Sequence, residues 1–216
     1  MSPELLAALT LGGSAFVVGL SGAMAPGSLL TVIISRTLTR GPGSAALMLV
    51  GHALLEGALL VGFAFGLQKV LADPRVGSVL GVVGGVILLW LGYRLVSDAL
   101  RGAAPENTQE PRSEPRMGPV LQGITVSLSN PYWTLWWATV GVKLAADGLV
   151  IGPIGVAAFF IGHELADIAW YGLVIGATAR GKRALPPSAF RVVLGTCGVF
   201  LLYLGARFGL DGIGVL

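Results

Sequence analysis

The sequence predicts an all-α integral membrane protein with six transmembrane helices, arranged as two inverted three-helix repeats in which helices 1 and 4 are broken. Three observations carry this prediction. Only 12% of the 216 residues are charged and 54% are hydrophobic, with a mean hydropathy of +0.81, whereas soluble domains carry roughly 25% charged residues. Six long apolar runs follow one another, and a short phrase around the only two histidines occurs twice.

Each apolar run is a candidate membrane span, because a stretch of about 18 or more residues with little charge is typical of a transmembrane helix. The runs lie at 5–35, 43–68, 76–93, 117–142, 149–179 and 192–206. The last run is short and needs flanking residues to span. The N-terminal segment has no Lys or Arg and contains Glu4, so it lacks the basic start of a cleaved signal peptide, and we expect the first helix to remain.

Basic residues are unevenly distributed between the two sides of a six-span chain. Ten of the 14 Lys and Arg residues fall at the odd-numbered connections: Arg36, Arg40, Arg94, Arg101, Arg112, Arg116, Arg180, Lys182, Arg183 and Arg191. Positive charge favours the cytoplasmic side, so we expect a multi-pass protein of the cytoplasmic (inner) membrane with both termini outside. The pI of about 9.4 is therefore explained by basic residues in the cytoplasmic connections, and we expect no nucleic-acid partner.

Two pairs of matching segments indicate an internal repeat. GHALLE at 51–56 matches GHELAD at 162–167, 111 positions later, and GVILLWLGYR at 85–94 shares seven of ten residues with GVFLLYLGAR at 198–207, at an offset of 113. Each half then contains three helices, and an odd number of spans inverts the second copy. Inverted repeats are typical of secondary transporters, whose substrate site lies at the repeat interface.

The repeats define three parts of the chain. The first three-helix repeat covers residues 1–98 and the second, inverted one covers 118–216. Residues 99–117 contain Pro105, Pro111 and Pro115 with dense mixed charge, a composition that predicts a flexible cytoplasmic loop.

Prolines interrupt the first and fourth runs at corresponding places. Pro26-Gly27 lies about 15 Å of helical rise before Arg36, and Asn130-Pro131 lies twelve residues before Lys143, so both breaks are expected near the membrane midplane. Helix ends exposed there present N–H and C=O groups suited to a carboxylate and an ammonium. An ordinary proline kink remains the alternative for each.

Ionisable residues lie midway along the second and fifth runs. His52 and Glu56 share one helix face, as do His163 and Asp167, with Glu164 beside the latter pair. An acid at a helix centre costs about 2.5–3.5 kcal/mol on insertion scales, so it is a functional candidate by default. These groups can hold an ammonium, a coupling cation or a proton; alternatively, each pair satisfies itself and locks the two helices together.

Two further interpretations concern single motifs. GHELAD resembles the His-Glu-x-x-His signature of zinc proteases, but its fifth position is Asp167 and no other histidine remains except His52. We therefore expect no enzyme, no metal centre and no cofactor.

Trp133 lies close to the second break and is expected to line the cavity, whereas Trp136 and Trp137 are expected to pack against neighbours or lipid.

These residues together resemble the lysine-exporter (LysE-type) translocator family. The resemblance rests on Ala25-Pro26-Gly27, on Gly51-His52 with Glu56, on the charged loop after the third run and on Asn130-Pro131, and it runs over about 5–207. The family often has Pro-Gly-Pro where this chain has Pro26-Gly27-Ser28, and a lysine where it has Tyr132. The second difference removes a positive charge near the expected site.

The resemblance implies a six-helix exporter of amino acids or similar small metabolites, driven by an ion or membrane gradient. The substrate is expected at Pro26, Gly27, Asn130, Pro131 and Trp133, and the ammonium or coupling proton at His52, Glu56, His163, Asp167 and Glu164. Related carriers move metal ions, so divalent-cation transport is the alternative. Small translocators commonly pair, and a homodimer is a further partner to test.

Overall fold

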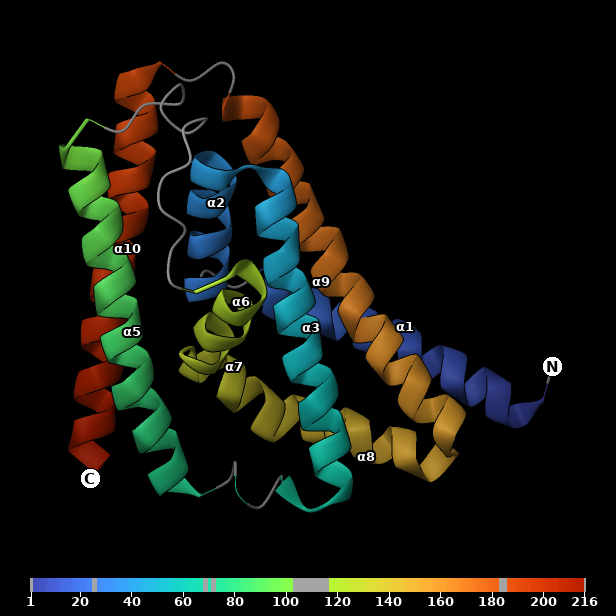
Figure 1. The fold of residues 1–216 in the computed structure, drawn as a ribbon. Coiled ribbons are helices and arrows are strands. Elements are labelled where there is room, and N and C mark those ends of the chain that lie inside the picture. Colours follow the sequence, from blue (N-terminus) through green and yellow to red (C-terminus); the bar gives the residue numbers. More distant parts are fainter. Residues whose placement is uncertain are drawn as a thin grey trace.

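The computed structural model describes residues 2–24, 27–67, 70, 73–102, 117–182 and 186–215. Within these residues every element is helical (Figure 1). Six helical stretches are long and apolar enough to cross a membrane, which confirms the predicted number: Pro3–Leu20, Pro42–Phe63, Gly81–Leu100, Tyr132–Ile151, Pro153–Gly181 and Pro187–Gly214.

The first apolar run forms two helices, α1 (Pro3–Ala23) and α2 (Ser28–Arg40). Helix α1 ends at the cap residue Met24, and α2 begins after Gly27, whose backbone is extended at φ −149°. Pro26 lies outside the described residues. The helix therefore ends where the sequence predicts the first break; that α1 and α2 are halves of one broken span remains a prediction.

The fourth run forms a chain of shorter elements. A six-residue helix and one π-helical turn separate two ten-residue helices: α6 (Pro119–Leu128), α7 (Pro131–Trp136), η2 (Trp137–Gly141) and α8 (Val142–Ile151). Asn130 separates α6 from α7, and its side-chain oxygen accepts a hydrogen bond from the N–H of Tyr132 at 3.1 Å. This cap is why the new helix starts at Pro131.

The expected end of this run near Lys143 is wrong. The helix continues to Ile151 because Lys143 pairs with Asp147 one turn later, with 2.6 Å between Nζ and the carboxylate oxygens. It ends at Gly152, whose φ of 105° is open to glycine and strained for other residues. The distance to Lys143 therefore does not measure how deep the second break lies.

Four long helices complete the fold: α3 (Pro42–Ala64), α5 (Pro74–Leu100), α9 (Pro153–Lys182) and α10 (Pro187–Val215). Helix α5 extends to Leu100, beyond the run at 76–93, and α10 extends on both sides of 192–206. The loop expected at 99–117 lies mostly at 103–116, outside the described residues. The boundaries of the two repeats remain predictions.

The first helix of each half of the chain packs on a long helix of the other half. Helix α1 packs on α9 and α6 packs on α3, while α5 and α10 lie side by side along their length (Figure 1). Close approach at each contact depends on glycines, since a Cβ at Gly12 would meet the carbonyl of Ala158, and one at Gly123 the carbonyl of Met48. This exchange is expected of two related halves, and the inverted orientation remains a prediction.

Candidate functional site

A cavity of about 190 Å³ lies where the end of α1, the start of α2, α3, the α6–α7 junction and α9 meet. Seven of the residues predicted to form the site line it: Gly27, His52, Glu56, Asn130, Trp133, His163 and Asp167. Glu164 is not among the lining residues. Pro26 lies outside the described residues, as does the side chain of Pro131.

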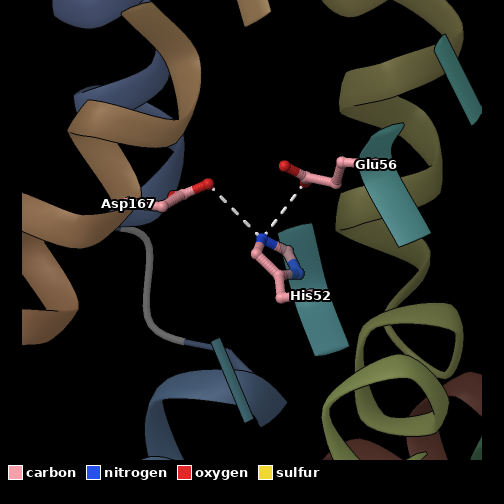
Figure 2. Close-up of side chains that lie close together, drawn as sticks. All are labelled: His52, Glu56 and Asp167. Atoms are coloured by element: carbon pink, nitrogen blue, oxygen red, sulfur yellow. Dashed lines mark ion pairs between the residues drawn. The ribbon is translucent and has the colours of Figure 1, made fainter. Parts of the chain in front are cut away.

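Two imidazoles and two carboxylates alternate in a ring inside this cavity. His52 Nε2 lies 3.1 Å from Glu56 Oε1 and 3.4 Å from Asp167 Oδ2, and Figure 2 shows this ring nitrogen between the two carboxylates, one from α3 and one from α9. His163 Nε2 closes the ring at 3.1 Å from Glu56 Oε2 and 3.6 Å from Asp167 Oδ2. Each histidine therefore contacts the acid of the other helix as well as the acid of its own helix.

The ring is deeply buried because it lies on the facing sides of two spanning helices. Glu56 is 1% exposed, and His52, His163 and Asp167 are each 5% exposed. With both imidazoles neutral, the two carboxylate charges would be uncompensated in the protein interior, and protonation of both rings would neutralise them. Protons on the imidazoles, or a bound cation in their place, can therefore balance the charge of the two carboxylates.

Two tryptophans hold the Glu56 carboxylate. The indole Nε1 groups of Trp133 and Trp137 both donate to Oε1, at 2.8 and 2.9 Å. Trp137 is completely buried. We expected Trp137 to serve packing alone, and this hydrogen bond to Glu56 was not predicted. Its partners are 81 residues apart, so local sequence patterns do not reveal it.

Ser127 fixes the ring plane of His52. Its hydroxyl oxygen lies 2.7 Å from His52 Nδ1 and 2.8 Å from the carbonyl of Gly123. The hydroxyl can donate to either partner, so it can accept from a protonated Nδ1 or donate to a neutral one. Sequence reasoning missed Ser127; the polar run Ser127–Asn130 just before the break was the available signal.

His163 is held differently. The ring of Trp136 stacks on it with centroids 4.6 Å apart and planes 21° apart. Its Nδ1 has no hydrogen-bond partner among the described residues. Trp136 also lines the cavity, so it belongs to the site, although the sequence interpretation assigned it to packing against neighbours or lipid.

Unpartnered polar atoms concentrate at the ring. In the part of the chain that the structure describes, the buried side-chain atoms without a partner include Glu164 Oε1 and His163 Nδ1. Glu56 Oε2 and Asp167 Oδ2 contact only the imidazoles of the ring. Buried polar groups are normally satisfied by protein, water or ligand. Glu164 adds a third acid close to the ring without facing the cavity.

The start of helix α2 also lines the cavity. Gly27, Leu29 and Leu30 of the α2 start line the cavity, and the glycine gives this helix no side-chain cap. The hydroxyl of Ser28 points elsewhere, toward the carbonyl of Val126 at 3.4 Å. The cavity is therefore lined both by the acidic ring and by the start of a helix, whose first N–H groups have no intrahelical partner.

The comparisons with known proteins agree with this architecture. The family model for the LysE type translocator matches residues 20–212. The chain belongs to the LysE type translocator family. It is also similar to the chemotactic transduction protein ChpE of Pseudomonas aeruginosa, with 28% identity over 203 residues that cover 93% of this chain and 97% of that protein. No solved structure matches it.

Membership of the LysE type translocator family confirms the resemblance seen in the sequence. Together with the six apolar helices, it makes this chain a multi-pass membrane protein that transports small molecules. The cavity and its ring are the candidate site for that transport in this LysE-type translocator.

Proposed function

We propose that this translocator exports small zwitterionic amino acids, or metabolites of the same charge pattern, across the cytoplasmic membrane. The observation that supports this most is the pairing within one cavity of a buried acidic ring and an uncapped helix start. A zwitterion carries the complementary charges at its two ends. The cargo would bind between α2 and the ring, with each end facing its complement.

The ammonium end would bind at Glu56 and Asp167. Glu56 Oε2 and Asp167 Oδ2 contact only the imidazoles of the ring. Glu56 Oε1 accepts two indole N–H bonds, so an ammonium would take the place of the imidazoles at Oε2 and Oδ2. Charge-assisted bonds from an ammonium would satisfy both acids at once.

The carboxylate end would bind at the start of α2. The first N–H groups of a helix have no intrahelical partner, and the helix dipole favours a negative charge there. Gly27 supplies no competing side chain. By contrast, the Asn130 side chain already caps the start of α7, so α2 provides the better carboxylate site of the two breaks.

Coupling to protons would follow from competition at the ring. Protonated His52 and His163 would neutralise Glu56 and Asp167, while a bound ammonium would do the same and favour neutral imidazoles. Proton entry would then release the cargo, and proton loss would accept the next one. This exchange predicts proton-coupled alternating access, with Ser127 serving His52 in both states.

The orientation of the protein follows from its basic residues. The junction of α2 and α3, the last turns of α5 and the last turns of α9 lie at one end of the molecule (Figure 1). These are the odd-numbered connections, which carry most of the Lys and Arg residues. We place this end in the cytoplasm and both termini outside.

Transport of a divalent metal ion is the second candidate. His52, Glu56 and Asp167 each offer a ligand atom within 4.8 Å of the others. A nitrogen and two carboxylate oxygens suit transition metals. The two indole donors on Glu56 occupy one of its oxygens, however, which leaves a smaller ligand set than a six-oxygen ion requires.

Transport by purified protein in proteoliposomes tests both candidates. Efflux of a panel of radiolabelled amino acids and of divalent metal ions would be measured with and without an imposed proton gradient. We expect gradient-dependent efflux of amino acids, lost in Glu56→Gln and Asp167→Asn and kept in the control Asp211→Asn, an exposed acid far along α10. Amino-acid efflux at parent rates by folded Glu56→Gln and Asp167→Asn proteins would refute the site, and efflux of metal ions alone would favour the second candidate.

A further inference from the structure

A second cavity, of about 260 Å³, lies between α2, α5 and the start of α6. Its charged lining residues are Arg36 and Arg40 of α2 and Arg94 and Asp98 of α5. A cavity lined by arginines suits a small anion, because guanidinium groups bind carboxylates and phosphates with paired N–H donors.

Arg36 is built into the wall of this cavity. Its side chain is buried, with the residue 7% exposed. Its Nε donates to Ser44 Oγ of α3 at 2.7 Å, and its Nη1 donates to Gln122 Oε1 of α6. These bonds fix the guanidinium at the point where α2, α3 and α6 meet, so its charge is oriented in advance.

Arg94 forms the outer rim of the cavity. Its guanidinium carbon lies 5.3 Å from the centroid of the Trp90 ring, and both side chains line the cavity. Arg94 is exposed. A cation held over an aromatic face stays charged and keeps its N–H edge available for an anion. The cavity thus has a fixed inner cation and an accessible outer one.

Helix α2 joins this cavity to the central one. Gly27, Leu29 and Leu30 line the central cavity, and Val32, Ser35 and Arg36 follow on the same helix to line the second. The second cavity lies at the end of α2 that carries most basic residues, the end assigned to the cytoplasm. A solute entering from the cytoplasm would meet the arginines before it meets the acidic ring.

We propose that the cavity lined by Arg36, Arg40 and Arg94 is an entry site that captures the carboxylate group of the cargo on the cytoplasmic side and passes it along α2 to the central cavity. This assignment rests on the proposed function in one respect, the identity of the cargo as a carboxylate-bearing solute. The binding itself is a separate property of these arginines. It can be measured without transport.

Ligand binding to the purified protein, followed by saturation-transfer NMR, tests the entry site with two probes. N-acetylleucine carries a carboxylate and no ammonium, whereas leucinamide carries an ammonium and no carboxylate. We expect Arg94→Gln to weaken N-acetylleucine binding about tenfold or more, the loss of one hydrogen bond to a charged group. Arg40→Gln should act in the same direction, and Arg94→Lys should keep part of the affinity.

The matched control is Arg101→Gln, which removes an exposed charge just after the end of α5 and outside the cavity. It should leave N-acetylleucine binding within twofold of the parent. Equal binding by parent and Arg94→Gln would overturn the proposal, as would an equal loss in Arg94→Gln and Arg101→Gln. Displacement of N-acetylleucine by inorganic phosphate at equal concentration would also overturn it, because the site would then bind phosphate or a lipid headgroup.

This experiment distinguishes a failure of the entry-site proposal from a failure of the proposed role of the acidic ring. If Glu56→Gln loses leucinamide binding while Arg94→Gln does not affect N-acetylleucine, the central site stands and the entry site is wrong. If Arg94→Gln loses N-acetylleucine while leucinamide does not bind at all, the entry site stands and the proposed role of the acidic ring is wrong.

Discussion

Replacing Glu56 by glutamine separates the charge of this residue from its structural bonds. Glutamine has nearly the same shape, and its amide oxygen can accept the two indole N–H bonds that Oε1 accepts at 2.8 and 2.9 Å. Its amide nitrogen would face His163 Nε2, which a neutral imidazole can offer as an acceptor. We therefore expect Glu56→Gln to fold with a free energy of unfolding within about 1 kcal/mol of the parent.

The same change removes the negative charge that would bind the ammonium. A hydrogen bond to a charged group contributes about 1.5–3 kcal/mol, which corresponds to a roughly 10- to 150-fold rise in the KM for export. The assay is efflux from proteoliposomes at several internal amino-acid concentrations. A KM within twofold of the parent, in protein that melts like the parent, would refute the assignment of Glu56 to the cargo.

Glu56→Ala serves as the structural comparison. It leaves the indole N–H groups of Trp133 and Trp137 without their acceptor, and each unsatisfied buried donor costs about 1–3 kcal/mol. We expect a loss of about 2–6 kcal/mol in unfolding free energy, measured by denaturation in detergent. Equal stability of the alanine and glutamine variants would show that these two hydrogen bonds contribute little.

Further predictions concern packing, ring orientation and topology. A Cβ at Gly51 would overlap the carbonyl of Val120, so Gly51→Ala should lower the melting temperature, whereas Gly172→Ala, with open space at its Cβ, should not; similar melting of both would contradict the α3–α6 packing. Ser127→Ala should reduce export several-fold with little change in melting, since it removes the partner of His52 Nδ1; parent-like export would deny Ser127 an orienting role. Tags at both termini should be labelled from outside intact cells, and a protected N-terminus would contradict the topology.

The sequence predicted the residues of the ring but not its connections. A spacing of four residues puts His52 with Glu56 and His163 with Asp167 on one face of a helix, whatever the fold. The cross-contacts between the two pairs depend on how α3 and α9 pack. Gly51 and Gly162 allow the close approach of α3 to α6 and of α9 to α1, and the spacing of four residues reveals none of these contacts.

The tryptophan contacts show the same limit. Trp136 and Trp137 follow Trp133 closely, and tryptophan in an apolar run is typical of a membrane interface. The π-helical turn at Trp137–Gly141 shifts the helix register just after these residues, a local feature that periodicity does not reveal. Trp133 and Trp137 both reach Glu56 because they are four residues apart and share one helix face.

Glycine and proline mark the starts of two helices, since α2 begins after Gly27 and α7 begins at Pro131; that these are breaks within single spans remains a prediction. Charge is a poorer marker, because Lys143 does not end the fourth run and pairs along the helix with Asp147. A charge that is paired one turn along the helix need not end it.

A structure of the protein with its transported amino acid bound would test the proposed binding site most directly. We expect the ammonium group within about 3 Å of the carboxylates of Glu56 and Asp167, and the carboxylate group at the N–H groups that begin α2. A cargo bound elsewhere, with the ring of His52, Glu56, His163 and Asp167 closed on itself, would contradict it.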